Sequence, residues 1–369
     1  MDRRHQATRP GARLGRGTTL IPMLQPEDFL ARSDSIMLDA RSPSEYQKGH
    51  IPGAVNFPLF TDDERVRVGT TYKQAGPDSA MELGLEIVGP KLADFVREAR
   101  RLNPRKLPIA MYCFRGGQRS QSLAWLLEKG RFQVEILEGG YKAYRRELIR
   151  SFQESQKIVV LSGCTGSGKT RLLQALKDRD EQILDLEALA SHKGSAFGGY
   201  HQPPELTTEM FHNLIHQEWS KLDRERTVWF EDEGRTLGKL LVPDEVWVQM
   251  RAAPVIFLDI PQEQRVKLLV EEYAGYDDAL LRDSLDRIAK RLGGLDHQLC
   301  LNALDEGRYA DVAKRTLDYY DQAYRHCVNK RQPDPFWELP LPGVETESNI
   351  ETLLRFYREN VQKELSVAG

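Results

Sequence analysis

Two short stretches of this sequence combine residue types that could carry chemistry. The first reads Tyr-Cys-Phe-Arg-Gly-Gly-Gln-Arg-Ser over residues 112–120, and the second reads Gly-Cys-Thr-Gly-Ser-Gly-Lys-Thr over residues 163–170. Each follows an apolar run typical of a buried strand and precedes a segment with the apolar spacing of a helix. Because a glycine-rich turn before a helix N-terminus directs backbone N–H groups at one centre, both stretches are predicted to bind anions.

Cys113 is the candidate nucleophile of the first loop. A helix N-terminus stabilises a thiolate, and Arg115 and Arg119 add positive charge beside it. Gly116 and Gly117 allow the backbone to curl inward. These features favour a persistent thiolate that could accept sulfur or selenium as a persulfide-type adduct, the alternative being a buried structural cysteine. The predicted anion- and donor-binding residues of this loop are Arg115, Gly116, Gly117, Gln118, Arg119 and Ser120.

The second loop satisfies the phosphate-binding pattern G-x-x-x-x-G-K-T in full, in the strand–loop–helix context that the pattern requires. Lys169 would neutralise the charge of a di- or triphosphate, and the Thr170 hydroxyl would face Mg²⁺ if a metal is bound. The side chain of Cys164 is expected to matter through its size, since the phosphate needs its backbone. The predicted diphosphate-binding residues are Gly163, Cys164, Thr165, Gly166, Ser167, Gly168, Lys169 and Thr170.

Carboxylates that could assist at this phosphate loop follow two other apolar runs. Glu231, Asp232 and Glu233 come after the first run, and Asp259 comes after the second. Metal-assisting carboxylates occupy such positions in phosphate-binding folds, but solvated loop acids do so as well. The pattern indicates polyphosphate binding and identifies no catalytic base for its hydrolysis.

The elements that must position these loops divide into two domains, because 369 residues exceed one ordinary compact core. Residues 21–150 alternate short apolar strands with amphipathic helices, which predicts a parallel α/β domain. A second α/β domain with the phosphate loop is expected over residues 157–262. The pattern becomes predominantly helical over residues 263–369, which should pack on the second domain. Residues 1–20 are predicted to be a disordered basic tail.

Individual strands are expected within both domains. In the first domain they are predicted near residues 35–39, 108–112 and 133–137. In the second domain they are predicted near residues 157–161, 182–184, 227–230 and 255–258.

Composition is typical of a soluble globular protein, with 40% hydrophobic and 29% charged residues. No apolar run approaches the roughly 18 residues that a membrane span needs, so no membrane association is expected. Cysteines 113, 164, 300 and 327 are too scattered for a zinc site, and they fit a reducing cytoplasm. The net charge of −3 argues against global attraction to nucleic acid. Basic runs near residues 97–106 and 142–150 are either solvated helix faces or contacts for RNA.

Further motifs resemble known families. The segment from Leu38 to Asn56, with Asp39, Arg41 and His50, resembles the N-terminal signature of rhodanese domains, and the likeness extends over residues 21–150. The fusion of such a domain to a phosphate loop resembles the tRNA 2-selenouridine synthase family along most of the chain. The segments that carry this second resemblance are residues 113–120, 137–141, 163–170, 185–187 and 194–198.

This resemblance implies a rhodanese-like parallel α/β domain followed by a P-loop NTPase-like α/β domain with a C-terminal helical region. It also implies a transferase that replaces sulfur by selenium at the wobble 2-thiouridine of tRNA, through an S-geranyl-2-thiouridine intermediate. The implied substrates are geranyl diphosphate and selenophosphate, with no tightly bound cofactor. The implied partners are tRNA and an enzyme that supplies selenophosphate. Asp39, Arg41 and His50 would organise the fold rather than react.

Two alternatives remain open from the residues. Cys113 and Arg119 are spaced as Cys-x5-Arg, one residue longer than in simple thiosulfate sulfurtransferases. This length recurs in rhodanese-related cysteine phosphatases and arsenate reductases, and it also suits a phosphate-bearing selenium donor. Tyr112 stands where many such phosphatases have His, and no general acid is evident nearby. The second alternative is a non-catalytic RNA-binding module that senses a nucleotide.

Overall fold

The computed structural model describes residues 21–191, 206–273, 277–331 and 335–363. The predicted tail over residues 1–20 and the motif over residues 194–198 therefore lie outside the described residues. Two compact units form, one from residues up to 47 together with 53–144, and one from residues 48–52 together with 145 onward. The chain passes from one unit to the other within one continuous helix, α6 (Gly140–Gln153), which ends where the predicted boundary between residues 150 and 157 lies.

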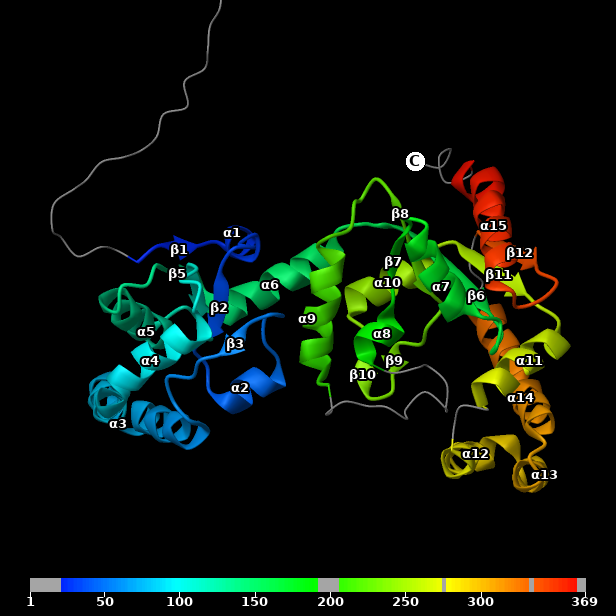
Figure 1. Cartoon of the computed structure of the whole chain (residues 1–369), viewed down its shortest axis with the longest axis horizontal. Coiled ribbons are helices and arrows are strands. Elements are labelled where there is room, and N and C mark those ends of the chain that lie inside the picture. The colour runs from blue at the N-terminus through cyan, green and yellow to red at the C-terminus, as the bar shows by residue number, and fades with distance from the viewer. Residues whose placement is uncertain (1–20, 192–205, 274–276, 332–334, 364–369) are drawn as a thin grey trace, which may run out of the picture. The chain divides into compact units, whose positions relative to one another are not determined.

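The first unit contains a five-stranded parallel sheet of order β1-β5-β4-β2-β3 (Figure 1). Its three longer strands agree with the predicted strands to within one residue. The central strand β4 leads directly to Cys113. The strands are β1 (Met23–Leu24), β2 (Ile36–Asp39), β3 (Val55–Asn56), β4 (Ile109–Tyr112) and β5 (Val134–Leu137).

Helices cover both faces of this sheet, because alternate residues of a strand point to opposite faces. Ile109 and Met111 of β4 pack with α4 (Leu92–Leu102) and α5 (Gln118–Lys129) on one face. On the other face, Tyr112 stacks on Tyr141 of α6, with ring centroids 6.2 Å apart. The shorter helices are α1 (Pro26–Leu30), α2 (Pro43–Lys48) and the 3-10 turn Gly89–Lys91.

The longest helix of this unit, α3 (Asp62–Val88), is bent in its middle (Figure 1). Gly76 has φ 91° and ψ 179°, which breaks the helical ladder, and Pro77 follows it. Proline lacks an N–H donor and is tolerated at the first turn of a helix, so the sequence Gly-Pro ends one arm and begins the next.

An ion pair is buried beside the Cys113 loop. Arg41 donates to Asp39 at 2.6 Å, and the two side chains are 2% and 0% exposed. The Arg41 guanidinium lies 3.8 Å from the centre of the Tyr141 ring. Burial opposes the charge of Arg41, but its hydrogen bond to Asp39 raises its pKa above the ordinary value. These contacts support a fold-organising role for the pair, because each charge is satisfied internally.

The second unit contains another five-stranded parallel sheet, of order β12-β11-β6-β8-β7. The strands are β6 (Lys157–Gly163), β7 (Gln182–Leu184), β8 (Thr227–Glu231), β11 (Val255–Asp259) and β12 (Phe336–Pro340). A separate hairpin pairs β9 (Thr236–Leu237) with β10 (Leu240–Leu241). The first four strands of the sheet occur where the sequence predicted them.

Helices also pack on the second sheet. Helix α7 (Lys169–Asp178) and helix α15 (Thr346–Phe356) share a core with Val159 and Leu161 of β6. The remaining α/β helices of this unit are α8 (Leu186–Ala190), α9 (Thr208–Trp219) and α10 (Asp244–Ala252). A π-helical turn, Tyr357–Val361, follows α15.

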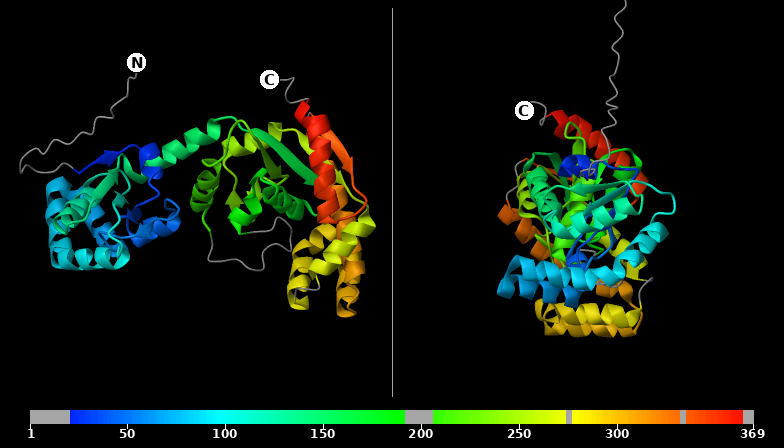
Figure 2. Two further views of the ribbon diagram at one scale, coloured as in Figure 1. Left: turned by 45° about the horizontal axis from the view of Figure 1, so that its top comes forward. Right: turned by 90° about the vertical axis from the view of Figure 1, so that its left-hand side faces the viewer.

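Four further helices form a subdomain of the second unit with its own apolar core (Figure 2, yellow and orange). They are α11 (Gln262–Tyr273), α12 (Asp278–Leu292), α13 (Gly294–Asp305) and α14 (Tyr309–Arg331). The predicted helical region over residues 263–369 missed β12, which returns to the sheet beside β11. Prolines at positions 335 and 340 make this segment resemble a loop, and proline is tolerated because β12 is an edge strand.

Within the described ranges, none of the helices combines the length and the apolar character needed to cross a membrane. The α/β fold predicted from the sequence is confirmed: one parallel α/β unit precedes a second that carries a helical subdomain.

Candidate functional site

Cys113 lies in the turn between β4 and the 12-residue helix α5. Its Sγ accepts a hydrogen bond from the Ser120 hydroxyl at 3.2 Å and lies 3.8 Å from the carbonyl oxygen of Gly117. The side chain is 3% exposed. Gln118 is the first residue of α5, so the sulfur is held at the helix N-terminus as predicted. Ser120 contacts the sulfur directly in this arrangement.

The N-terminus of α6 holds the Cys113 loop. The N–H of Tyr141 donates to the Cys113 carbonyl at 2.8 Å, and the N–H of Lys142 donates to the Phe114 carbonyl at 3.0 Å. Gly140 has φ 60°, and a Cβ at this position would collide with the carbonyl oxygen of Cys113. The carbonyls of the loop are thus bound on one side, which is required if its N–H groups are to face an anion on the other.

Glycine is also required within the Cys113 loop, at Gly116. Its φ is 66°, and a Cβ there would lie 2.8 Å from the carbonyl oxygen of Leu137. Gly117 has open space around the position of a Cβ. The two loops that follow β4 and β5 therefore pack backbone against backbone. The role of Gly140 in shaping the cysteine loop was not predicted from the sequence.

The two arginines of the Cys113 loop lie in different surroundings. Arg119 pairs with Glu45 of α2 through contacts of 2.5 and 3.2 Å. Burial tends to raise the pKa of the Glu45 carboxyl, but the hydrogen bond and charge of Arg119 hold that pKa below its ordinary value. Arg115 is exposed, with its guanidinium 5.9 Å from the Phe114 ring centre. Arg115 is thus the more accessible cation, whereas the charge of Arg119 is balanced by Glu45.

The phosphate loop joins β6 to α7 in the second unit. Lys169 donates from Nζ to the carbonyl of Gly163 at 2.9 Å, and Thr170 donates to Glu231 at 3.0 Å. Gly166 and Gly168 have φ of 76° and 73°, values that favour glycine. Among the described residues, the Ser167 hydroxyl is buried without a hydrogen-bond partner. The strand, loop and helix of the predicted cradle are present, and the carbonyls of Cys164 and Thr165 accept internal hydrogen bonds.

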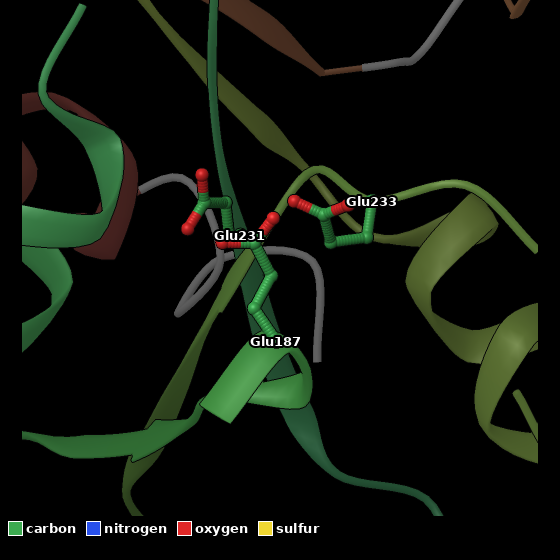
Figure 3. A group of neighbouring side chains, drawn as sticks. All are labelled: Glu187, Glu231 and Glu233. Carbon is green, nitrogen blue, oxygen red and sulfur yellow. The ribbon is translucent and has the colours of Figure 1, made fainter. Parts of the chain in front are cut away.

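Three carboxylates gather beside the phosphate loop (Figure 3). One oxygen from each of Glu187, Glu231 and Glu233 lies within 4.8 Å of the others. Glu187 follows β7, Glu231 is the last residue of β8, and Glu233 lies just beyond it. Strand β8 is the direct neighbour of β6. The carboxyl ends of these parallel strands meet at one edge of the sheet, which places the acids next to Thr170.

The carboxylates predicted from the sequence lie in different surroundings in the structure. Glu231 and Glu233 belong to the cluster, whereas Asp232 binds the hydroxyls of Ser162 and Tyr324. Asp259 is exposed at the end of β11 and lies outside the cluster. Glu187 was not predicted as a site residue, although it follows the predicted strand at 182–184 just as Glu233 follows β8.

The electrostatics of the cluster suit a cation. Burial raises the pKa of Glu231 to about 7, with Lys169 acting in the opposite direction. Burial also raises the pKa of Glu233, and the charges of Glu187 and Glu231 add to this effect. Carboxylates in such proximity repel one another unless protons or a metal ion compensate their charge. Oxygen donors of this kind are the ligands that Mg²⁺ prefers.

The helical subdomain holds the other side of the phosphate loop. Arg265 of α11 is 5% exposed and makes two bonds to Asp321 of α14, at 2.9 and 2.6 Å. The same guanidinium donates to the carbonyl of Thr165 at 3.1 Å. Tyr324 of α14 donates to Asp232 at 2.8 Å and accepts from the N–H of Gly163 at 3.3 Å. Sequence patterns did not indicate these residues, because they lie 56 to 162 positions from their partners.

Cys164 is a neutral thiol in these surroundings. Burial raises its pKa to about 11, and the nearby carboxylate of Asp321 contributes. Burial likewise raises the pKa of Cys300, in the core of the helical subdomain, to about 11. Because the thiolate is the nucleophilic form, these surroundings do not suit either residue to act as a nucleophile.

Comparison with known proteins agrees with this geometry. Residues 156–338 match the family described as "tRNA 2-selenouridine synthase AAA domain", and residues 25–147 match "Rhodanese-like domain". A tRNA 2-selenouridine synthase from Bdellovibrio bacteriovorus is 34% identical over 341 residues, which cover 80% of this chain and 89% of the relative. This chain belongs to the tRNA 2-selenouridine synthase family.

Other members of the tRNA 2-selenouridine synthase family give similar values. One from Shewanella sediminis is 36% identical over 338 residues, covering 80% of this chain and 88% of the relative. One from Nitrosomonas europaea is 39% identical over 257 residues, and this match covers 65% of the chain and 64% of the relative. The resemblance inferred from the sequence is thereby confirmed, whereas the roles of individual site residues remain predictions.

Replacing Gly140 by Ala should destabilise the Cys113 loop. A positive φ costs an alanine about 1–2 kcal/mol, and the collision with the Cys113 carbonyl adds to that cost at this position. Gly53→Ala is the matched control, because Gly53 has φ 85° with open space around it. Hydrogen exchange of peptides covering β4 measures the opening free energy of the unit. Equal losses in both variants would contradict a role for the backbone packing.

Replacing Asp321 by Asn should weaken pyrophosphate binding to the phosphate loop about tenfold, which corresponds to roughly 1.4 kcal/mol. Arg265 would lose the partner that holds it against the Thr165 carbonyl. Electrostatics alone predicts the opposite sign, since the change removes a negative charge near a phosphate. The control is Asp318→Asn on the same helix, where Asp318 accepts a bond from Gln262. Calorimetry measures the dissociation constant of pyrophosphate for both variants. Tighter binding by the Asp321 variant would exclude a role for Asp321 in positioning Arg265.

Proposed function

We propose that this chain makes 2-selenouridine in tRNA by replacing the sulfur of wobble 2-thiouridine. The observation that carries this proposal is the presence of a complete cysteine loop and a complete phosphate loop in one member of the tRNA 2-selenouridine synthase family. Either loop alone occurs in many unrelated functions. The proposed activity is that of a cytoplasmic transferase with tRNA as its macromolecular substrate.

The P-loop unit would carry a first step in which geranyl diphosphate alkylates the thiouridine. The thiocarbonyl sulfur attacks the first geranyl carbon while the carbon–oxygen bond breaks, and diphosphate departs with the electron pair. Loss of the N3 proton leaves S-geranyl-2-thiouridine. Lys169 and the amides of the loop would hold the diphosphate and stabilise its growing charge. This role explains a phosphate loop without requiring nucleotide hydrolysis.

A magnesium ion would fit beside this diphosphate. Glu187, Glu231, Glu233 and the Thr170 hydroxyl provide hard oxygen donors at the correct edge of the sheet. The ion would supply additional neutralisation of the leaving diphosphate. Lys169, whose Nζ lies 4.0 Å from Glu231, would hold the diphosphate next to this ion.

The Cys113 loop would carry the second step, in which the selenium of selenophosphate attacks C2 of the prenylated base. The C2–S bond breaks, geranyl thiolate departs and takes up a proton, and water then cleaves the Se–P bond to release phosphate. Cys113 lies at a helix N-terminus and would deliver selenium, while the exposed Arg115 would bind the phosphate of the donor. The Ser120 hydroxyl would orient the sulfur through its hydrogen bond. The pairing of Arg119 with Glu45 weakens the phosphatase alternative. A cysteine phosphatase needs the arginine of its Cys-x5-Arg loop, here Arg119, to face the oxyanion.

Substituting Lys169 of the phosphate loop or Cys113 of the cysteine loop should block a different step of the reaction. With thiolated tRNA, Lys169→Ala should slow geranylation at least about 100-fold, a loss on the scale of one stabilising contact to the leaving group, and should still convert synthetic S-geranyl RNA. Cys113→Ala should accumulate S-geranyl RNA without selenouridine. Cys300→Ala, in the distant helical core, is the control thiol. Nucleoside mass analysis measures both products.

A Cys113→Ala enzyme that makes selenouridine at the normal rate would refute the proposed second step. Nucleotide-dependent tRNA binding without any change in nucleoside content would instead support the RNA-binding alternative. Release of phosphate from an aryl phosphate would support the phosphatase alternative.

Metal removal should affect only the first step. EDTA should suppress geranylation of an anticodon stem-loop, excess Mg²⁺ should restore it, and selenation of a pre-geranylated stem-loop should continue. Glu231→Gln should raise the Mg²⁺ concentration needed for half-maximal geranylation, because one ligand charge is lost. Asp259→Asn is the control, since Asp259 lies outside the carboxylate cluster. Identical Mg²⁺ dependence in both variants would exclude this cluster as the metal site.

A further inference from the structure

A groove lies beside the Cys113 loop in the first unit. Its volume is about 960 Å³, within the range of pockets that bind small molecules. Both arms of α3 line it, together with residues from α2 and from the first turns of α5. The bend at Gly76 allows both arms to contribute, as Figure 1 shows for the course of this helix. We call this feature the α3 groove.

The walls of the α3 groove are mainly apolar and accessible to solvent. Val66, Tyr72, Met81 and Leu85 all belong to α3 and all line the groove. Their exposed fractions are 66%, 61%, 42% and 64%. Leu59, Phe60 and Val88 extend the apolar surface inward. Clusters of large apolar side chains on an accessible surface mark binding sites, because single exposed residues are ordinary but contiguous patches are not.

The polar end of the α3 groove meets the cysteine loop. Gln118, Arg119 and Ser122 line this end, and Ser120, which bonds the Cys113 sulfur, lies between them on the same helix turn. Charges along the groove are nearly balanced, since its lining contains two acidic side chains, Glu45 and Asp62, and three basic ones, Arg65, Lys73 and Arg119. A strongly charged ligand such as an RNA backbone would find little net attraction here. The groove fits a ligand with a polar reactive end and an apolar chain.

We propose that the α3 groove binds the prenyl chain of the S-geranylated nucleoside while Cys113 acts on its base. This inference rests on the proposed function, in which the second step uses a nucleoside with a branched ten-carbon apolar chain on sulfur. The chain would lie along α3, and the thioether would lie near the N-terminus of α5. The groove would then distinguish the prenylated intermediate from the 2-thiouridine that precedes it.

The test compares stem-loop RNAs that carry 2-thiouridine, S-methyl-2-thiouridine or S-geranyl-2-thiouridine, using the full chain. In the double variant Val66→Ser, Leu85→Ser, the dissociation constant for the geranyl RNA should rise about tenfold, because burial of several methylene groups is lost. Binding of the other two RNAs should not change. Both side chains are largely exposed, so the fold should tolerate their replacement.

A matched control is Leu92→Ser on α4. Leu92 is 39% exposed and lies outside the groove, so this variant should bind all three RNAs like the original chain. Geranylation of 2-thiouridine from geranyl diphosphate is a second control, and the groove variant should perform this P-loop reaction at an unchanged rate. Selenation of the geranyl RNA should show an increased KM in the groove variant.

Each other result would overturn the proposal. If the variant binds geranyl RNA normally, the prenyl chain does not use the groove, and the proposed function stands as long as the original chain makes selenouridine. If the variant binds all three RNAs more weakly by the same factor, the groove contacts the RNA itself. If the variant only alters the sedimentation coefficient, the groove contacts a second copy. Failure of the original chain to make selenouridine would refute the proposed function, and the binding comparison would still decide the role of the groove.

Discussion

Both candidate sites depend on one backbone constraint: the chain must pass from a buried parallel strand to a helix within a few residues. Such a turn directs N–H groups outward at the helix N-terminus, but it also leaves carbonyl groups that need donors. In the first unit, the amides of Tyr141 and Lys142 bind these carbonyls. In the second unit, Lys169 and Arg265 bind the carbonyls of the phosphate loop. The shape of each loop is therefore determined by contacts with other segments as well as by its own sequence.

Features that depend on neighbouring residues could be predicted from the sequence. The strands around Cys113 and the phosphate loop show apolar runs next to glycine-rich turns, and these local patterns determine the parallel α/β fold of both units. The strand before Glu231 was predicted for the same reason. The contacts of Arg119 were not, because its partner Glu45 lies 74 positions earlier and a charged residue does not indicate its partner.

Features that arise from distant segments could not be predicted in this way. Tyr324 contacts the phosphate loop from a helix about 160 residues downstream. Glycine is required at position 140 because the carbonyl of Cys113 packs against it. β12 was missed because its prolines resemble a loop, although its pairing with β11 satisfies its backbone. The α3 groove depends on a bend at Gly76 whose direction local sequence does not specify.

The position of β12 affects how the chain folds during synthesis. The first unit has all its strands once residue 137 has been made, so its sheet can form early on the ribosome. The second sheet lacks its edge strand until residue 340, and α15 covers its core only from residue 346 onward. The phosphate loop at residues 163–170 is thus made long before β12 completes the sheet that carries it, and such distant strand pairing slows folding. The P-loop unit can therefore complete its sheet only after residue 340 has been made, whereas the first unit has all its strands by residue 137.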